Sequence, residues 1–241
     1  MWLMSLLACG EKTEDTSTGA TLAPVCEEIT AIACEDAAIL DLSLQDDAVS
    51  DGAVTTTEDA TDFVSVIDAS AGGYNAASSN PWVYVKFTAA GLEKVEIDDE
   101  TALESMDWDM SLRRFIVRLN GGSTGASCVG SASLLESSYS EVISVPEGLT
   151  YVEDDFYTDD CTIINDSSGL PGSPQVALAP WWTYDGCVQT TMVPHLIQLA
   201  DGSVVKMVVE SYYESGQEAC NNGTGSGEGS AVYTLRWTYM D

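Results

Sequence analysis

The chain has 241 residues, of which 45% are hydrophobic, and its 39 acidic residues against 8 basic ones give a formal charge of −31. That hydrophobic share is enough for a packed core and excludes a disordered chain. Phosphate backbones and anionic headgroups repel so negative a surface, which excludes nucleic-acid partners and leaves a lipid anchor as the expected contact with a membrane. Short apolar runs between Gly-, Ser- and Thr-rich turns predict an all-β fold of antiparallel sheets, with few short helices and long loops.

The N-terminus has the residue order of a bacterial lipoprotein signal. The apolar run "MWLMSLLACG" places a small residue, Ala8, before Cys9. We expect a signal segment over residues 1–9, lipidation of Cys9, a flexible polar tether over 10–25 and a single domain over 26–241. The run is short and has no basic residue, so we expect the true start to lie upstream; the alternative is an ordinary buried N-terminal segment.

Setting Cys9 aside for lipid leaves an even set of cysteines: Cys26, Cys34, Cys128, Cys161, Cys187 and Cys220. An even set suits disulfides in an oxidising compartment. We predict a local Cys26–Cys34 bridge and, less directly, a Cys161–Cys187 bridge. Zinc does not fit, because the chain has no C-x-x-C spacing and only one histidine.

Strand signals occur in three places. Residues 82–87 alternate with period two before a turn at Ala90-Gly91, which predicts a hairpin with "LEKVEIDD". Residues 110–119 are predicted to be one strand ending at "NGG". Towards the C-terminus, residues 195–213 contain two β-rich runs joined at Asp201-Gly202, and "AVYTLRWTY" follows, so we expect a three-stranded meander. Residues 121–190 are loop-rich, with weak helical spacing in "SLLESSYSEVISV".

Three of the eight basic residues, Arg113, Arg114 and Arg118, lie in the middle run. A strand can bury arginine when its charge is compensated. Asp107 and Asp109 lie a few residues before these arginines, so we expect them and nearby acidic groups to pair with the arginines.

Several of these stretches resemble one family. "DWDMSLRRFIVRLNGGSTG" is similar to the D-W-D signature of the HmuY family, which consists of secreted bacterial haem-binding lipoproteins. "PWVYVKFTAAG" resembles the first hairpin of that family, and "IQLADGSVVKMVVESYY" with "YTLRWTY" resembles its C-terminal hairpin and closing strand. The likeness covers about residues 80–125 and 194–240. It implies a HmuY-like β-fold and a non-enzymatic, lipid-anchored protein of the outer membrane or cell surface, with the periplasm as the alternative.

The resemblance further implies that haem is bound between loops and passed to an uptake receptor, with a host haem protein as another partner. Haem iron takes His, Met, Cys or Tyr as axial ligands. The candidates are His195, the only histidine, with Met192 close to it in sequence, and also Met110, Met106 and Met207. Arg114 is the candidate for binding a haem propionate. The alternatives are that His195 is an ordinary strand residue and that the methionines fill the core.

Three other patterns have weaker functional interpretations. Residues 121–125 match G-x-S-x-G, but the segment that follows has poor helix propensity, so we reject a nucleophile elbow. Trp181, Trp182 and Tyr184 could form a ligand platform, although adjacent aromatic residues more often lie in a core. An oxygen-rich segment could bind calcium, which would suit a structural or adhesive surface lipoprotein without haem, or it could be a solvated loop. Its residues are Asp154, Asp155, Asp159, Asp160, Asn165 and Asp166.

Overall fold

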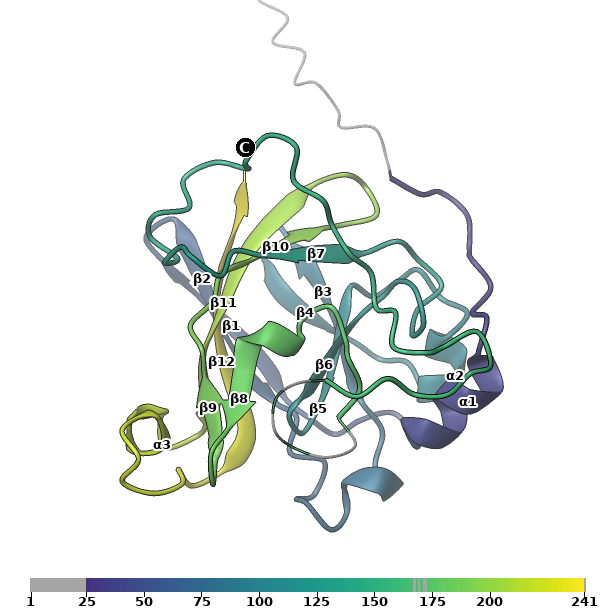
Figure 1. The fold of residues 1–241 in the computed structure, drawn as a ribbon, viewed down its shortest axis with the longest axis horizontal. Coiled ribbons are helices and arrows are strands. Elements are labelled where there is room, and N and C mark those ends of the chain that lie inside the picture. Colours follow the sequence, from purple (N-terminus) through teal and green to yellow (C-terminus); the bar gives the residue numbers. More distant parts are fainter. Residues whose placement is uncertain (1–24, 167, 169, 171–172, 241) are drawn as a thin grey trace, which may run out of the picture.

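A computed structural model describes residues 25–240 apart from 167, 169, 171 and 172. The described chain is built from antiparallel strands with three short helices, which confirms the all-β prediction (Figure 1). The helices are α1 (Glu35–Asp41), α2 (Asp99–Ala102) and α3 (Glu218–Asn221), with 3-10 turns at Ala77–Ser79 and Ala179–Trp181. Cys9 and the segment before it lie outside the described residues, as does nearly all of the expected tether.

The largest sheet has six strands in the order β1-β2-β12-β11-β10-β7. These are β1 (Val54–Asp59), β2 (Asp62–Asp68), β7 (Gly130–Ser133), β10 (His195–Gln198), β11 (Val204–Tyr213) and β12 (Ser230–Met240). A four-stranded sheet has the order β4-β3-β5-β6, with β3 (Val83–Thr88), β4 (Gly91–Val95), β5 (Met110–Arg113) and β6 (Ile116–Leu119). A separate hairpin joins β8 (Trp182–Tyr184) to β9 (Val188–Thr190).

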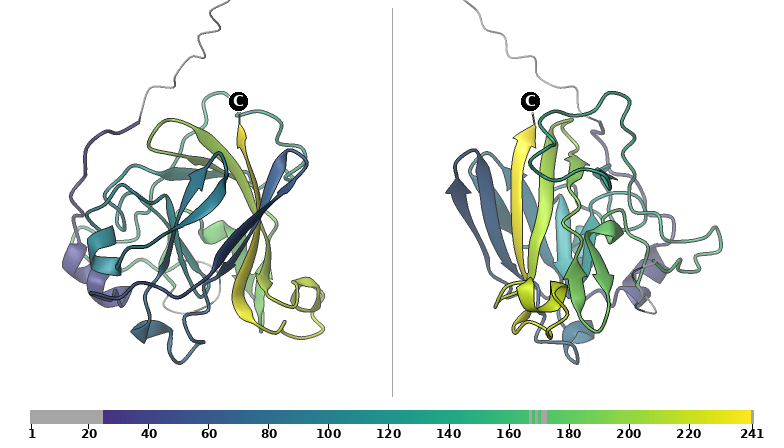
Figure 2. Two further views of the ribbon diagram at one scale, coloured as in Figure 1. Left: turned by 180° about the vertical axis from the view of Figure 1, so that it is seen from behind. Right: turned by 60° about the vertical axis from the view of Figure 1, so that its left-hand side comes forward.

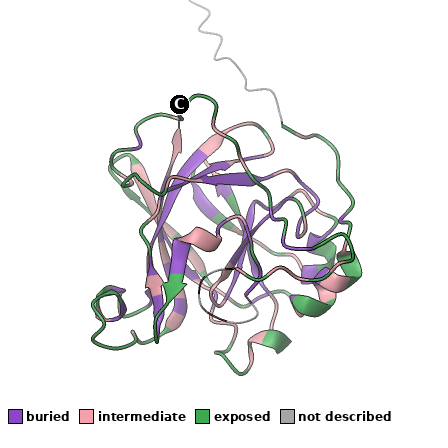
Figure 3. Ribbon diagram, viewed as in Figure 1, coloured by how far each residue is buried: buried purple, intermediate pink, exposed green. Residues whose placement is uncertain are grey.

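The two larger sheets face each other across the main core (Figure 2). Trp237 of β12 stacks on Phe63 of β2 at a ring-centroid distance of 4.5 Å and meets Phe87 of β3 edge-on at 4.9 Å. Figure 3 shows buried residues along most of the strands, while many of the connecting loops are exposed and the loop over residues 120–129 is largely buried. Burial of these apolar faces is the main force that holds the sheets together.

Two of the predicted strand groups are confirmed. β3 and β4 form a hairpin that turns before Gly91, whose φ of 134° suits glycine and lets β4 approach Thr56 of β1. β10, β11 and β12 form the C-terminal meander, with Gly202 in the first turn at φ 85°. The weak helical spacing after β7 gives turns instead of a helix.

The prediction of one strand over 110–119 is wrong. β5 and β6 are antiparallel partners joined by a tight turn in which Arg114 adopts a φ of 54°. Tertiary contacts hold this unfavourable backbone: Arg114 N–H donates to Ala69 O, and the Tyr233 hydroxyl donates to Arg114 O at 2.6 Å.

The predicted carboxylate partners of the arginines are also wrong. The guanidinium groups of Arg113 and Arg118 lie 4.6 and 4.1 Å from the ring centroid of Trp82, and Arg118 donates to the Tyr84 hydroxyl at 3.0 Å. Asp109 instead accepts a hydrogen bond from the Phe87 backbone. Ion pairs among the described residues involve only Lys94 and Arg236 as cations, so aromatic faces and carbonyls take the place of direct carboxylate contacts.

Arg113, Arg118, Trp82 and Tyr84 form a buried aromatic and cationic cluster, in which loss of solvent changes the pKa of Arg113. Burial, followed by the neighbouring charge of Arg118, lowers the pKa of Arg113 to about 10. The negative charge of Asp99 acts in the opposite direction and raises the pKa of Arg113. The Asp99 carboxylate accepts hydrogen bonds from the backbone N–H groups of Trp82 and Gln45, each at 2.9 Å. The contacts of Arg113 and Arg118 are therefore structural.

Three disulfides form, as the even cysteine set predicted, but both predicted pairings are wrong. The bridges are Cys26–Cys128, Cys34–Cys161 and Cys187–Cys220. The N-terminal segment runs beside the 126–128 loop, where Thr30 N–H donates to Ala126 O, and this placement brings Cys26 next to Cys128. Two bridges close separations of 102 and 127 residues, which cysteine spacing does not reveal.

Replacing Arg118 tests the role of the cluster. Arg118→Ala should lower the free energy of unfolding by about 3 kcal/mol, because it leaves a cavity beside Trp82. The control Arg236→Ala removes a partly exposed arginine that pairs with Glu210, Asp59 and Asp62, and should cost no more than about 1 kcal/mol. Urea unfolding measures both values, and equal losses would contradict this assignment.

Candidate functional site

A groove of about 780 Å³ lies between the edge strand β7 and the β8–β9 hairpin. Ser131 and Ser133 of β7 line one side, and Trp182 and Thr191 line the other. A second pocket of about 770 Å³ borders the Cys34–Cys161 disulfide. Both hollows share Val152, Glu153 and Asp155, so the segment over residues 151–155 separates them.

Asp154 anchors this dividing segment. Its wholly buried carboxylate accepts hydrogen bonds from Leu119 N–H at 3.0 Å, Thr124 Oγ1 at 2.7 Å and Ala177 N–H at 2.7 Å. Burial raises its pKa to about 6, although these donors act in the opposite direction. Asp154, predicted from the sequence to lie in a calcium-binding or solvated loop, instead holds three segments together by internal hydrogen bonds. Within the described residues, no three His, Cys, Asp or Glu side chains are placed to bind a metal ion.

The glycine-rich loop fits around this anchor. Gly122 has a φ of 63°, and a Cβ atom there would collide with the Asp154 carbonyl, which accepts Ser123 N–H. A Cβ at Gly125 would collide with Asn120. The loop leads into strand β7 and not into the helix that a nucleophile elbow requires, so its glycines serve close backbone packing.

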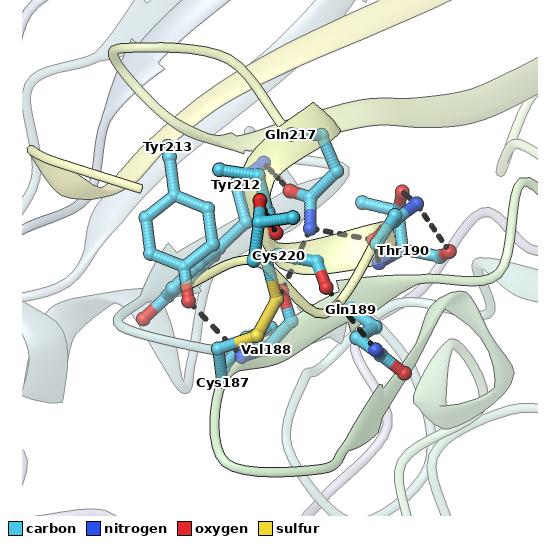
Figure 4. Close-up of a disulfide and its surroundings, with 11 residues drawn as sticks. Cys187, Val188, Gln189, Thr190, Tyr212, Tyr213, Gln217 and Cys220 are labelled. Carbon is cyan, nitrogen blue, oxygen red and sulfur yellow. Dashed lines mark hydrogen bonds between the residues drawn. A yellow bond between two sulfur atoms is a disulfide. The ribbon is translucent and has the colours of Figure 1, made fainter. Parts of the chain in front are cut away.

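A disulfide and two amide side chains fix the β8–β9 wall (Figure 4). The Cys187–Cys220 bridge joins the hairpin to α3. Gln217 accepts Tyr212 N–H through Oε1 and donates through Nε2 to Val188 O and Asn221 Oδ1. The Tyr213 hydroxyl accepts Val188 N–H at 3.0 Å. Sequence reasoning missed this clamp, because an isolated Gln in a polar loop carries no recognisable signal.

His195 lies directly behind the groove wall. Its Nδ1 is 2.9 Å from Oγ of Ser133, which lines the groove, and its Nε2 has no hydrogen-bond partner in the described structure. Register places Ser133, His195 and Met207 in one row across β7, β10 and β11. Met207 is therefore its cross-strand neighbour. The imidazole is wholly buried, and desolvation lowers its pKa to about 4, so it is neutral near pH 7.

The other candidate ligands lie in different environments. Met192 is 46% exposed, has a φ of 59° and follows Thr191 of the groove lining. Met110 is buried between the sheets. Arg114 donates to the carbonyl and hydroxyl of Ser230. His195 and Met192 thus flank the groove without lining it, whereas Met110 and Arg114 belong to the four-stranded sheet and the turn that follows β5.

The paired tryptophans do not form an open platform. Trp181 and Trp182 are buried, with ring centroids 5.9 Å apart, and Trp181 also packs on Tyr233. Trp182 does line the groove, while Tyr184 is exposed on the same hairpin. These aromatic residues mainly attach the hairpin to the core.

Acid titration tests the burial of His195. Unfolded His has a pKa near 6.5, so between about pH 6.5 and 4 the unfolded chain binds a proton that the folded chain does not, and stability falls as the pH falls. Relative to His195→Leu, the wild type should lose about 3 kcal/mol over this range. Asp109 and Asp154, whose pKa values burial raises to about 6, give the opposite slope in both proteins and cancel in the comparison. Urea unfolding at each pH gives the two curves, and parallel curves would contradict the buried neutral imidazole.

Comparison with known proteins identifies the family. The family model for HmuY protein matches residues 78–223. A search of curated proteins gives no match. A solved candidate HmuY-like haem-binding protein from Bacteroides vulgatus ATCC 8482 is 19% identical, with a TM-score of 0.49 over 77% of this chain and 96% of that one.

Two other solved structures are similar to lesser degrees. A candidate lipoprotein from Bacteroides fragilis NCTC 9343 is 17% identical, with a TM-score of 0.47 over 76% of this chain and 92% of that one. An apo HmuY analogue from Tannerella forsythia is 16% identical, with a TM-score of 0.39 over 81% of this chain and all of that one. At these values the assignment depends on the sequence match. Since that match spans more than half of the chain, the protein belongs to the HmuY family.

Proposed function

We propose that this protein is a non-enzymatic haem-binding lipoprotein and that the haem ring enters the groove beside β7. Family membership over residues 78–223 is the observation that carries the proposal. Every residue that lines the groove falls inside this matched segment, whereas the second pocket also uses Ala33 and Cys34 outside it. The groove is therefore the better candidate for a property that belongs to the family.

The groove is large enough for a small-molecule ligand and has an apolar part against which a flat ring could lie. Its volume lies within the range of small-molecule sites, and several apolar side chains line it. These are Leu135, Leu149, Val152, Val176, Pro180 and Trp182. Leu135 and Val152 are exposed, so a ligand in the groove could cover their apolar surface.

His195 and Met192, which flank the groove without lining it, are the proposed axial ligands. The unpartnered Nε2 of His195 is a neutral imidazole nitrogen, the form that binds iron. To reach a haem iron, the ring must leave its hydrogen bond with Ser133. The exposed Met192 thioether lies next to the lining residue Thr191 and needs no such release.

The proposed location is the outer membrane or the cell surface, with lipid on Cys9 as the anchor; the periplasm is the alternative. None of the described helices is long and apolar enough to cross a membrane. A haem-uptake receptor and a host haem protein are the proposed partners in transfer. The complete burial of His195 favours a second candidate function, a structural or adhesive lipoprotein of the same fold that does not bind haem.

Absorbance titration with hemin tests the proposed function. The wild type should develop a shifted Soret band, and His195→Ala and Met192→Ala should each weaken binding by about tenfold or more, which is about 1.4 kcal/mol. Met240→Ala, at the end of β12 and outside the groove lining, is the control and should bind like the wild type. Circular dichroism establishes that each variant is folded. A wild-type protein that leaves the hemin spectrum unchanged would contradict the proposal and favour the second candidate.

A further inference from the structure

The groove combines an apolar wall with negative charge. Glu153, Asp155 and Asp166 all line it, and its described lining contains no Lys, Arg or His. Glu153 and Asp155 are exposed at its edge, while Asp166 is partly buried and accepts hydrogen bonds from Ser168. Haem carries two propionates, so the sign of this charge bears directly on how such a ligand can bind.

The scarce cations are engaged elsewhere. Of the eight basic residues, Lys12 lies outside the described residues, and the other seven are Lys86, Lys94, Arg113, Arg114, Arg118, Lys206 and Arg236. Lys206 donates to the carbonyls of Tyr139 and Val142, and Lys94 donates to Ser50 O. Lys86 is exposed on β3 of the other sheet. None of the seven lines the groove, and those with described contacts would have to give up their present partners to reach it.

The side of the groove formed by β7 offers a neutral polar group. Ser131 is fully buried and lines the groove, and its Oγ has no hydrogen-bond partner among the described residues. Its backbone N–H and C=O are already paired with Val152. A buried hydroxyl without a partner is costly unless a ligand atom or water completes it, so an uncharged polar ligand group suits this position better than a carboxylate flanked by acidic residues.

We propose that the groove disfavours a ligand that enters with a negatively charged edge. It binds a flat apolar ring with the uncharged edge of the ring inward, and any carboxylates of the ligand remain in solvent. This inference rests on the proposed haem function and extends it to the ligand class, namely porphyrins whose buried edge bears no free carboxylate. The physical reason is like-charge repulsion at the groove edge, which builds specificity by penalising the wrong orientation.

Binding of hemin and of hemin dimethyl ester, measured in the same mixed solvent, tests the inference. The ester should bind at least as tightly as hemin. The double variant Glu153→Gln/Asp155→Asn should strengthen hemin binding by about tenfold and leave ester binding unchanged. Asp46→Asn/Asp47→Asn makes the same change in net charge at exposed positions outside the groove and should alter neither. Raising NaCl from about 50 to about 500 mM should strengthen hemin binding, because salt screens repulsion.

Each outcome separates the two proposals. Hemin binding that is more than about tenfold tighter than ester binding, and that weakens with salt, would overturn the charge inference and leave the haem function intact. Ester binding without hemin binding would support the charge inference and contradict haem as the ligand. Failure of both compounds to bind would overturn both.

Discussion

The buried carboxylate of Asp154 is the constraint from which the architecture of the groove follows. It joins β6, the glycine-rich loop and the segment at Ala177 through three hydrogen bonds. A buried charge is tolerated only when such donors replace water. Because side chains in an extended segment alternate, turning Asp154 inward turns Glu153 and Asp155 outward, where they line the groove. One internal bond network thus sets both the shape of the groove and the sign of its charge.

The positions of the few cations also keep the groove acidic, because most of their side chains are held away from it. Arg113 and Arg118 lie against Trp82 in the interior, and Lys206 is buried beneath the loop at Tyr139. These contacts stabilise the connection between strands and loops, but they remove positive charge from the surface. The proposed ligand, haem, is anionic, whereas the groove is lined by Glu153, Asp155 and Asp166, so the orientation of the ligand matters as well as its identity.

Much of the fold could be predicted from local pattern. Period-two alternation together with glycine turns identified β3–β4 and the meander of β10, β11 and β12. Their turns contain glycines with positive φ, a conformation that glycine adopts easily and that the sequence therefore signals. The β5–β6 turn was missed because Arg114 takes that conformation without any Gly, Asn or Pro signal, supported by Tyr233 from the other sheet. A contact across 119 residues cannot be read from the local sequence.

The site was less predictable than the fold for the same reason. Asp154 stood in an acidic run typical of solvated loops, and its partners come from three separate segments. His195 could be selected by residue type, but its position behind Ser133 and beside Met207 depends on strand register. Cysteine parity indicated three bridges, while their connectivity depends on how the N-terminal segment wraps around the domain.

The most direct test of the groove as the ligand site is hydrogen exchange measured by mass spectrometry with and without hemin. Bound hemin should slow exchange in peptides that cover residues 130–135 and 149–155 on the β7 side and residues 179–184 on the hairpin side, and Asp154→Ala should lose this protection. Unchanged exchange on both sides of the groove, or protection confined to the exposed β1–β2 hairpin outside the groove lining, would contradict the groove as the ligand site.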